Sequence, residues 1–186
     1  IRNSSASTRN FNVWTGGADY SNVLDEGPAA DAARRKIGEQ MSASLHQEWH
    51  SQGIGMGYRY EGSPVIVPDG APATPDEADQ YISVARPGHH APHAWLQDGR
   101  STLDLFGHGF VMLRFGTVPA DVTAIVEMAA EHSLPLTVID INDESIARLY
   151  ERSLVLVRPD AHVCWRGDRL PEDVGSGRAE DRRRLL

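Results

Sequence analysis

Apolar residues recur at spacings of three and four along the first quarter of the chain, between residues 28 and 51. Such spacing places apolar side chains on one face of an α-helix. The acidic residues at 25 and 26 and the proline at 28 favour a helix start, because acidic groups stabilise the positive end of a helix and proline fits its first turn. The pattern therefore predicts a long helix over about 28–51. Its apolar stripe consists of Ala30, Ala33, Ile37, Met41, Leu45 and Trp49.

From residue 93 onward, short apolar runs alternate with segments of helical periodicity. The runs HAWL, GFVMLRFG, LPLTVIDI, SLVLVRPD and HVCWRG have the length and composition of strands. Helices are predicted over 121–133 and after Asp143, which stands at the N-cap position of the second helix. The order strand–helix–strand, helix and hairpin predicts an α/β domain with a mixed sheet flanked by helices. This order is the topology of a thioredoxin-like fold without its closing helix.

Between these two regions lies a stretch without periodicity. The segment PDGAPATPDEADQ holds three prolines, several acidic residues and no large apolar residue, which is typical of stiff, solvated linkers. Before it, YRYEGSPVIV predicts a short strand, and Pro64 places that strand at an edge or an irregular position. We therefore expect a long helix and a short strand within 1–67, a linker at 68–92, a thioredoxin-like domain at 93–174 and a charged tail at 175–186.

The overall charge narrows the classes of partner. The net charge of −8 argues against binding to a nucleic-acid backbone or an anionic membrane. No apolar run approaches the roughly 20 residues that a membrane span needs. We therefore expect a cytoplasmic protein with neither nucleic acid nor membrane as partner. The first residue, Ile1, is not an initiator methionine and no signal-peptide core follows it, which suggests a piece of a longer chain.

A single cysteine, Cys164, excludes an internal disulfide and any CxxC motif. Its place in the apolar run HVCWRG favours a buried strand residue over a reactive thiol. Redox members of the thioredoxin fold carry CxxC at the start of the helix that follows the first long strand. The corresponding segment here, FGTVPAD at 115–121, has no cysteine, and no serine or tyrosine stands near Thr117. The predicted domain therefore lacks dithiol chemistry.

Three histidines, His89, His90 and His93, crowd into the stretch PGHHAPHAWL. Structural zinc sites need three or four ligands in a tetrahedral arrangement, usually fixed on a strand or helix. The two prolines keep this segment extended, so neighbouring histidines tend to point to opposite sides. Solvated or capping histidines are therefore favoured over a metal cluster, and the role of the three remains open.

Four acidic residues, Asp104, Asp140, Asp143 and Glu144, are candidates for paired carboxylates in acid–base catalysis. The last three stand where a strand gives way to a helix, and acidic residues at such places usually cap the helix. They are therefore interpreted as structural.

Two further motifs give only weak signals of a catalytic triad or a phosphate-binding loop. Ser101 and His108 form no recognisable triad, because no serine lies in a GxSxG turn. The glycines of DLFGHGFV lead into a strand rather than a helix, so a tight turn is favoured over a phosphate-binding loop. From the residues alone we assign no catalytic, cofactor-binding or metal-binding residue.

Three blocks of the sequence carry a family likeness: GIGMGYRYEGSPVIVPDG, RPGHHAPHAWLQDGRSTLDLFGHGFVMLRFG and SLVLVRPDAHVCWRGD. In this order they resemble the C-terminal region of FAD-dependent aromatic hydroxylases of the phenol hydroxylase and 2,4-dichlorophenol 6-monooxygenase group. The likeness spans about 53–167, and the last block is its most specific part. Two positions depart from the family pattern: His90 stands where arginine is frequent, and Cys164 stands where alanine is frequent.

The resemblance implies a parent enzyme that binds FAD, is reduced by NADPH or NADH and hydroxylates phenolic rings with molecular oxygen. It also implies that the dinucleotide-binding and second flavin-contacting motifs lie upstream of these residues. On this interpretation the chain is a C-terminal structural and oligomerisation domain that binds no cofactor itself. Its partners would be the upstream flavin-binding domain and, through the apolar stripe of the 28–51 helix, a second copy.

Two other functions stay open at the level of sequence. One is a free-standing thioredoxin-fold enzyme or binding module without dithiol chemistry. The other is a metal-dependent hydrolase that uses the histidines at 89, 90 and 93. Both lack the residues that their chemistry normally requires.

Overall fold

The computed structural model describes residues 21–172, except for the side chains of 44–49. The chain divides into two compact units. The first contains the chain up to Gly57 together with Pro75–Tyr81, and the second contains Tyr58–Thr74 and the chain from Ile82 onward. No helix in the described part of the chain has the length and apolar character needed to span a membrane.

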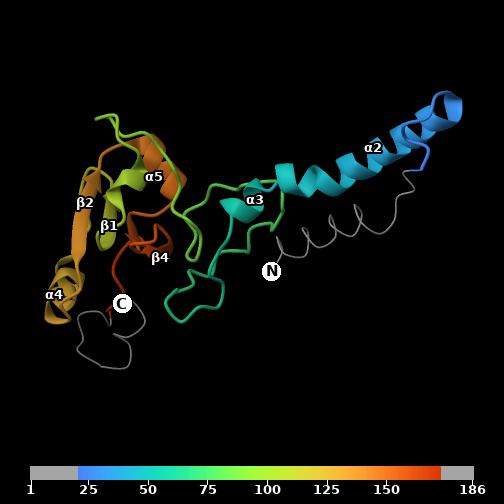
Figure 1. The fold of residues 1–186 in the computed structure, drawn as a ribbon. Coiled ribbons are helices and arrows are strands. Elements are labelled where there is room, and N and C mark those ends of the chain that lie inside the picture. Colours follow the sequence, from blue (N-terminus) through green and yellow to red (C-terminus); the bar gives the residue numbers. More distant parts are fainter. Residues whose placement is uncertain (1–20, 173–186) are drawn as a thin grey trace. The chain divides into compact units, whose positions relative to one another are not determined.

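The first unit is built around helix α2 (Pro28–Trp49), followed by the short helix α3 (Gln52–Gly55) (Figure 1). The predicted long helix is confirmed, with its end two residues earlier. Within 28–43 the least exposed positions are Ala30, Ala33, Ile37 and Met41, so the first four stripe positions form one face. The side chains of Leu45 and Trp49 lie outside the described residues.

A glycine in α3 fixes the packing of the 75–81 segment within this unit. A Cβ atom at Gly53 would lie 1.9 Å from the carbonyl oxygen of Glu77 and 2.6 Å from that of Gln80. Only glycine allows the two backbones to approach so closely.

The second unit contains a four-stranded mixed sheet in the order β2-β1-β3-β4. Strand β1 (Phe110–Phe115) pairs in parallel with β2 (Leu136–Ile141) and antiparallel with β3 (Leu154–Val157), which pairs antiparallel with β4 (Val163–Gly167). The helices are η1 (Thr102–Leu105), α4 (Thr123–Glu131) and α5 (Glu144–Tyr150). The predicted mixed α/β fold is confirmed.

Each face of the sheet is covered by one helix. Val111 and Leu113 of β1 pack in the cluster that contains Ile146 of α5, whereas Met112 packs in the cluster that contains Ile125 of α4. Both faces are covered, and accordingly β3 and the first four residues of β1 are continuous apolar runs rather than alternating ones. All four residues of β3 are buried.

The outer edge of β4 is closed by two distant parts of the chain, here called the closing segments, residues 67–69 and 88–91. The Val67 N–H donates to the Cys164 carbonyl at 2.8 Å, and the Gly88 N–H donates to the Val163 carbonyl at 2.7 Å. The Val163 N–H in turn donates to the His89 carbonyl at 2.9 Å. Backbone donors and acceptors that an edge strand would leave unpaired are thereby satisfied.

Three expectations differ from the structure. Neither YRYEGSPVIV nor HAWL forms a named strand; HAWL contributes one isolated bridge, between Trp95 and Ser101. Much of the stretch expected to be a solvated linker belongs to the second unit, where Ala85 and Ala91 are fully buried. Side-chain polarity suggested solvent, but the backbone of this stretch supplies the hydrogen bonds that the β4 edge needs.

The entry into the sheet is anchored at one carbonyl group. The hydroxyl groups of Tyr150 and Thr102 each donate to the Pro92 carbonyl at 2.8 Å. The same Thr102 oxygen accepts from the Ala94 N–H at 3.0 Å. Helix α5, η1 and the 92–94 segment are therefore held together by buried hydrogen bonds.

Candidate functional site

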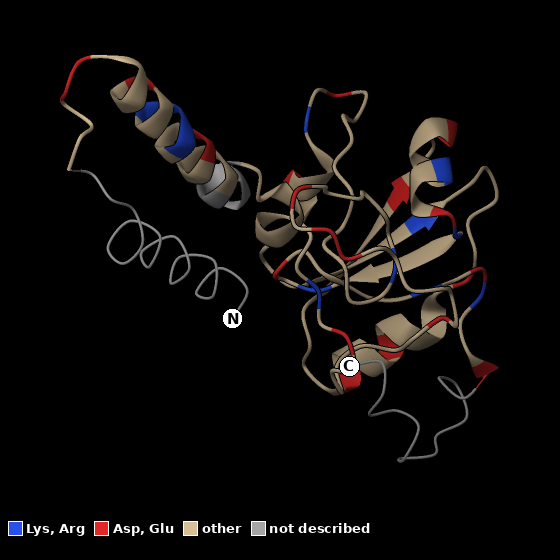
Figure 2. Ribbon diagram, turned by 90° about the vertical axis from the view of Figure 1, so that its right-hand side faces the viewer, with Lys and Arg blue, Asp and Glu red and all other residues tan. Residues whose placement is uncertain are grey.

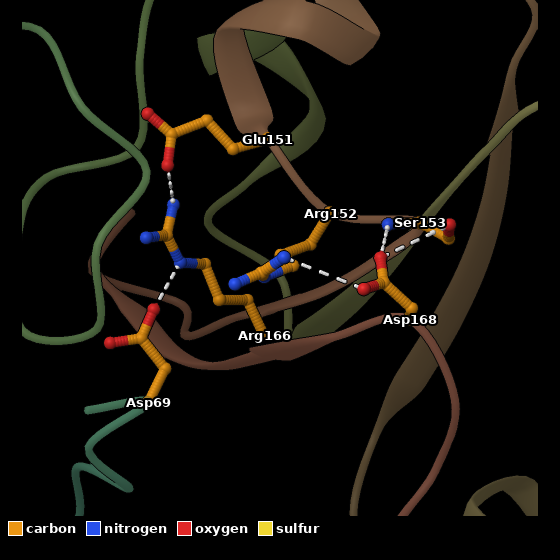
Figure 3. A network of polar contacts seen from close by, with 6 residues as sticks. All are labelled: Asp69, Glu151, Arg152, Ser153, Arg166 and Asp168. Atoms are coloured by element: carbon orange, nitrogen blue, oxygen red, sulfur yellow. Dashed lines mark hydrogen bonds and ion pairs between the residues drawn. The ribbon is translucent and has the colours of Figure 1, made fainter. Parts of the chain in front are cut away.

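A buried arginine forms the centre of the main polar network in the second unit (Figure 3). Arg166 of β4 pairs with Asp69 of a closing segment, with 2.6 Å between Nε and Oδ2. The two side chains are only 3% and 8% exposed. Burial alone would raise the pKa of Asp69, but the Ala71 N–H and the Arg166 guanidinium together hold it below its ordinary value. The pair therefore remains charged and ties the closing segment to the sheet.

Glu151 gives Arg166 a second carboxylate, with 2.9 Å between Oε2 and Nη1. This residue caps α5 in the left-handed conformation, with φ of 63°. Glycine is the usual residue there, because a Cβ atom costs roughly 1–2 kcal/mol in this region. A glutamate instead of glycine extends the Arg166 network from the closing segment to the end of α5.

An exposed group of contacts lies beside this network (Figure 3). Asp168 accepts a hydrogen bond from the Ser153 N–H at 3.1 Å and lies 3.5 Å from the Arg152 guanidinium. These three residues and Glu151 line an open hollow that begins at Phe115. The other residues of its lining are Gly116, Glu144, Ala147 and Arg148.

The hollow lies at the carboxyl end of β1, where the predicted fold would carry its dithiol. The residues after β1 supply no thiol, and Thr117 and Val118 are exposed. Glu144 pairs with Arg148 at 3.6 Å, one helical turn away. The other acidic groups of the hollow also face arginines, since Glu151 pairs with Arg166 and Asp168 with Arg152.

The three histidines of PGHHAPHAWL face different partners. His89 Nε2 lies 2.7 Å from the Thr74 hydroxyl, and the His90 ring lies against the ring of His162. The His93 ring packs edge-on against Trp95. Within the described residues, no group of three or more histidine, cysteine, aspartate or glutamate side chains is arranged to hold a metal.

The surroundings of His89 favour its neutral form. The Thr74 hydroxyl accepts from the Arg59 guanidinium at 2.7 Å and can therefore donate its own proton to His89 Nε2. Burial and the positive charges of Arg59 and Arg86 lower the pKa of His89. The carboxylate of Glu61 opposes this shift, and it pairs with Arg59 at 3.0 Å.

A second buried histidine holds the turn between β3 and β4. His162 Nδ1 donates to the Asp160 carbonyl at 3.0 Å, and the rings of Tyr58 and Tyr60 lie within 4.9 Å of its ring centre. The Arg158 guanidinium stacks over Tyr60. Burial lowers the pKa of His162, despite the opposing effect of Asp160. This block, RPDAH, thus folds as one packed turn.

The candidate carboxylates all have structural partners. Asp143 caps α5 by accepting from the N–H groups of Ser145 and Ile146, which confirms the predicted N-cap. Asp140 was expected to cap the same helix, but it forms a two-bond ion pair with Arg114 on the neighbouring strand. The register of β1 and β2 places these two residues opposite each other.

Ser101 and Asp104 form a capping box at the start of η1. The Ser101 hydroxyl accepts from the Leu103 N–H, and the Asp104 carboxylate accepts from the Ser101 N–H at 2.8 Å. The predicted tight turn is confirmed, because Gly107 has φ of 116°. His108 is exposed in this turn.

Cys164 is a buried strand residue, as predicted. Its thiol donates to the Leu156 carbonyl at 3.3 Å, and burial raises its pKa to about 12. The thiolate is therefore absent at neutral pH.

Reasoning from sequence missed Asp69, Glu151 and Arg166. One signal was available: an arginine inside the apolar run HVCWRG must be buried, and a buried charge needs a counter-charge. The sequence did not indicate which acidic residue supplies it.

Comparison with known proteins places these residues in context. A family model described as "Aromatic-ring hydroxylase, C-terminal" matches residues 84–183. The FAD-dependent monooxygenase apdD of Emericella nidulans is 36% identical over 148 residues, covering 72% of this chain and 24% of the relative. The 2,4-dichlorophenol 6-monooxygenase of Cupriavidus pinatubonensis is 30% identical over 184 residues, covering 87% of this chain and 30% of the relative. The chain thus spans less than a third of these curated relatives.

Solved structures show the same likeness. The rebeccamycin biosynthetic enzyme RebC with reduced flavin matches with a TM-score of 0.77 and 37% identity, over 98% of this chain and 34% of that chain. The flavin-dependent monooxygenase PieE, in complex with FAD and substrate, matches with a TM-score of 0.65 and 28% identity, over 89% of this chain and 31% of that chain.

Proposed function

This chain belongs to the family of aromatic-ring hydroxylase C-terminal domains, and from that membership we propose that it serves as the structural C-terminal domain of an FAD-dependent monooxygenase. The parent enzyme would use NADPH or NADH to hydroxylate a phenolic aromatic compound in the cytoplasm. In this proposal the domain carries none of the catalytic residues and holds no cofactor by itself.

The family match over 84–183 is the observation that carries the proposal. The polar groups within that stretch support a structural role, because those that sequence suggested for catalysis are engaged elsewhere. Asp143 caps a helix, Asp140 pairs with Arg114, and His89 is bound by Thr74.

We further propose that the second unit is a thioredoxin-like domain that has kept the sheet and lost the dithiol. The strand order β2-β1-β3-β4, with only β1 and β2 parallel, supports this assignment. In this proposal residues 116–119, which follow β1 and are exposed, take the place of the dithiol.

The proposed partners are the upstream flavin-binding domain of the parent enzyme and a second copy of the chain. Helix α2 supports this proposal, because its least exposed positions within 28–43 are apolar and lie on one face. An Ile37→Asp variant tests the second copy: light scattering on the wild type should report a dimer that the variant loses.

The central experiment is a chimera. The C-terminal region of the 2,4-dichlorophenol 6-monooxygenase from Cupriavidus pinatubonensis is replaced by this chain, and FAD retention and 2,4-dichlorophenol hydroxylation are compared with those of the same enzyme truncated before that region. A structural domain should restore retained FAD and turnover relative to the truncated enzyme. In parallel, FAD is titrated into the isolated chain, where fluorescence should show no saturable binding. Saturable FAD binding by the isolated chain, or a chimera no better than the truncated enzyme, would contradict the proposal.

A further inference from the structure

The two closing segments hold β4 by different means. The 67–69 segment is fixed by the buried Asp69–Arg166 pair, and the pKa of Asp69 is lowered from its ordinary value of 3.8. This pair therefore keeps both charges across the pH range in which histidines titrate. The 88–91 segment has the sequence GHHA and contains neither a carboxylate nor an arginine. Its contact with β4 therefore depends on backbone hydrogen bonds and on histidines.

Two histidines stand opposite each other in this contact. His90 and His162 form an isolated antiparallel bridge, and their ring centres lie 5.3 Å apart. Next to them, the Ala91 N–H donates to the Ala161 carbonyl at 2.8 Å. Like charges directly opposite each other across two strands are destabilising. Protonation of both rings would therefore work against the hydrogen bonds that close the edge.

The ring of His162 is enclosed on its other sides as well. Its side chain has no exposed surface, and the rings of Tyr58 and Tyr60 pack against it. Nδ1 donates to the Asp160 carbonyl, whereas Nε2 is buried and has no hydrogen-bond partner within the described residues. A proton added at Nε2 would create a buried charge and a buried donor without an acceptor. The charged ring therefore needs access to water that the closed segment denies it.

The charged groups around His162 do not offset this cost. The Asp160 carboxylate favours the protonated ring, with 3.6 Å between Oδ1 and Nδ1, but it is paired with Arg158 at 3.0 Å. Arg158 and His90 act in the opposite direction. Over the second unit acidic and basic residues are intermixed (Figure 2), so these neighbouring groups, rather than a field of one sign, determine how His162 titrates.

His89 adds a second group of the same kind to the 88–91 segment. It is 6% exposed, and the Arg59 guanidinium lies 3.5 Å from its Nε2. Arg86 disfavours its protonated form as Arg59 does, and the Glu61 carboxylate alone favours it. Protonation of His89 would therefore add a third positive charge beside two arginines and one carboxylate.

We propose that the 88–91 closing segment is an acid-responsive latch, which leaves β4 when His89 and His162 become protonated while the 67–69 segment stays in place. Opening gives both charged rings access to water and uncovers the Val163 end of the β4 edge. Because the pKa values of both histidines are lowered in the closed state, closure is fully favoured above about pH 6.5 and weakens as the pH falls below it.

The test is native-state hydrogen exchange of the full chain at pH 7.5 and 5.5. The reporters are the N–H groups of Gly88, Ala91 and Val163, which bond across the contact. Their exchange is expressed as protection factors, which divide out the intrinsic effect of pH. A histidine that is uncharged in the closed state raises the opening constant by at most about tenfold between these pH values, so protection should fall by up to about a hundredfold for two.

Urea separates opening of the latch from unfolding of the whole unit. At pH 5.5 the three reporters should exchange at rates that change little with low urea, because opening exposes little surface. The N–H groups of Val67 in the other closing segment and Phe115 in the sheet should exchange at rates that rise with urea. If the reporters share the urea dependence of Val67 and Phe115, the edge opens only with the whole unit and the proposal is overturned.

Two variants identify the group that responds to acid. In His162→Asn the side-chain amide can donate to the Asp160 carbonyl in place of Nδ1 but cannot be protonated, so the fall in protection should shrink by up to about tenfold. His108→Asn removes an exposed histidine and is the matched control, in which the fall should be unchanged. An unchanged fall in His162→Asn overturns the proposal. Equal protection of the wild type at both pH values overturns it whether or not His162→Asn folds.

Discussion

The two edges of the same sheet are treated in opposite ways. The β4 edge is covered by the closing segments and fixed by the buried Asp69–Arg166 pair, whereas the β2 edge keeps its outward backbone groups unpaired within the described residues. The two edge strands differ in sequence, LTVIDI in β2 and VCWRG in β4. The contrast lies in the backbone partners of each strand: the closing segments bind β4, whereas β2 is bound only by β1 within the described residues.

Removal of Arg166 should have the largest effect on stability, because this residue fixes the closed β4 edge. Arg166→Met leaves Asp69 buried without its counter-charge, so the free energy of unfolding should fall by about 3–5 kcal/mol. Urea denaturation followed by tryptophan fluorescence measures this loss. The double variant Asp69→Asn, Arg166→Met removes both partners and should recover part of it. A loss below about 1 kcal/mol for Arg166→Met would show that the pair does not hold the edge.

Acidification should have the second-largest destabilising effect on the closed β4 edge. The folded-state pKa values of His89 and His162 are lowered, so as pH falls below about 6.5 the unfolded chain binds protons before the folded chain does. Stability is therefore full above the unfolded pKa and declines below it, by at most roughly 1.4 kcal/mol per histidine for each pH unit. Urea midpoints at pH 7.5 and 5.5 measure the decline. Replacing both histidines by glutamine should flatten it.

Two substitutions of Glu151 separate the contribution of its ion pair with Arg166 from the backbone strain at the C-terminal end of α5. Glu151→Gly loses a half-exposed ion pair but relieves the left-handed strain, so the stability should change by less than about 1 kcal/mol. Glu151→Ala loses the same pair and keeps the strain, so it should be less stable than Glu151→Gly by about 1 kcal/mol. Thermal unfolding of the two variants side by side measures the difference. Equal stabilities would mean that the backbone at 151 carries no strain.

Substitution at the open β2 edge should have the smallest effect on stability. Thr137 on β2 is exposed, so Thr137→Lys should change the free energy of unfolding by less than about 0.5 kcal/mol. Ala91→Lys, in a closing segment, is the matched change at the other edge and should destabilise strongly, because Ala91 is fully buried. Urea denaturation of both variants decides the point, and equal losses would remove the distinction between the edges.

Local patterns predicted the parts of the fold that depend on neighbouring residues. The α2 helix, the Asp143 cap, the tight turn at Gly107 and the buried Cys164 each follow from a few adjacent positions. The β4 closure could not be predicted in this way, because Asp69 and Arg166 lie 97 residues apart and no periodicity links them. The proline-rich stretch looked like a linker, since composition reports on side chains, while its role depends on backbone N–H and C=O groups.

The closing segments also have a consequence for the order of folding. The sheet itself is local, since β1 to β4 occupy residues 110–167, whereas the Asp69–Arg166 pair closes a loop of 97 residues. Contacts between distant residues carry a larger loop-closure entropy and form more slowly than local ones. The four strands can therefore assemble before the closing segments arrive, and during that interval both edges are exposed. The time at which β4 is covered, rather than the stability of the finished sheet, then determines how long the folding chain can pair with another copy of itself.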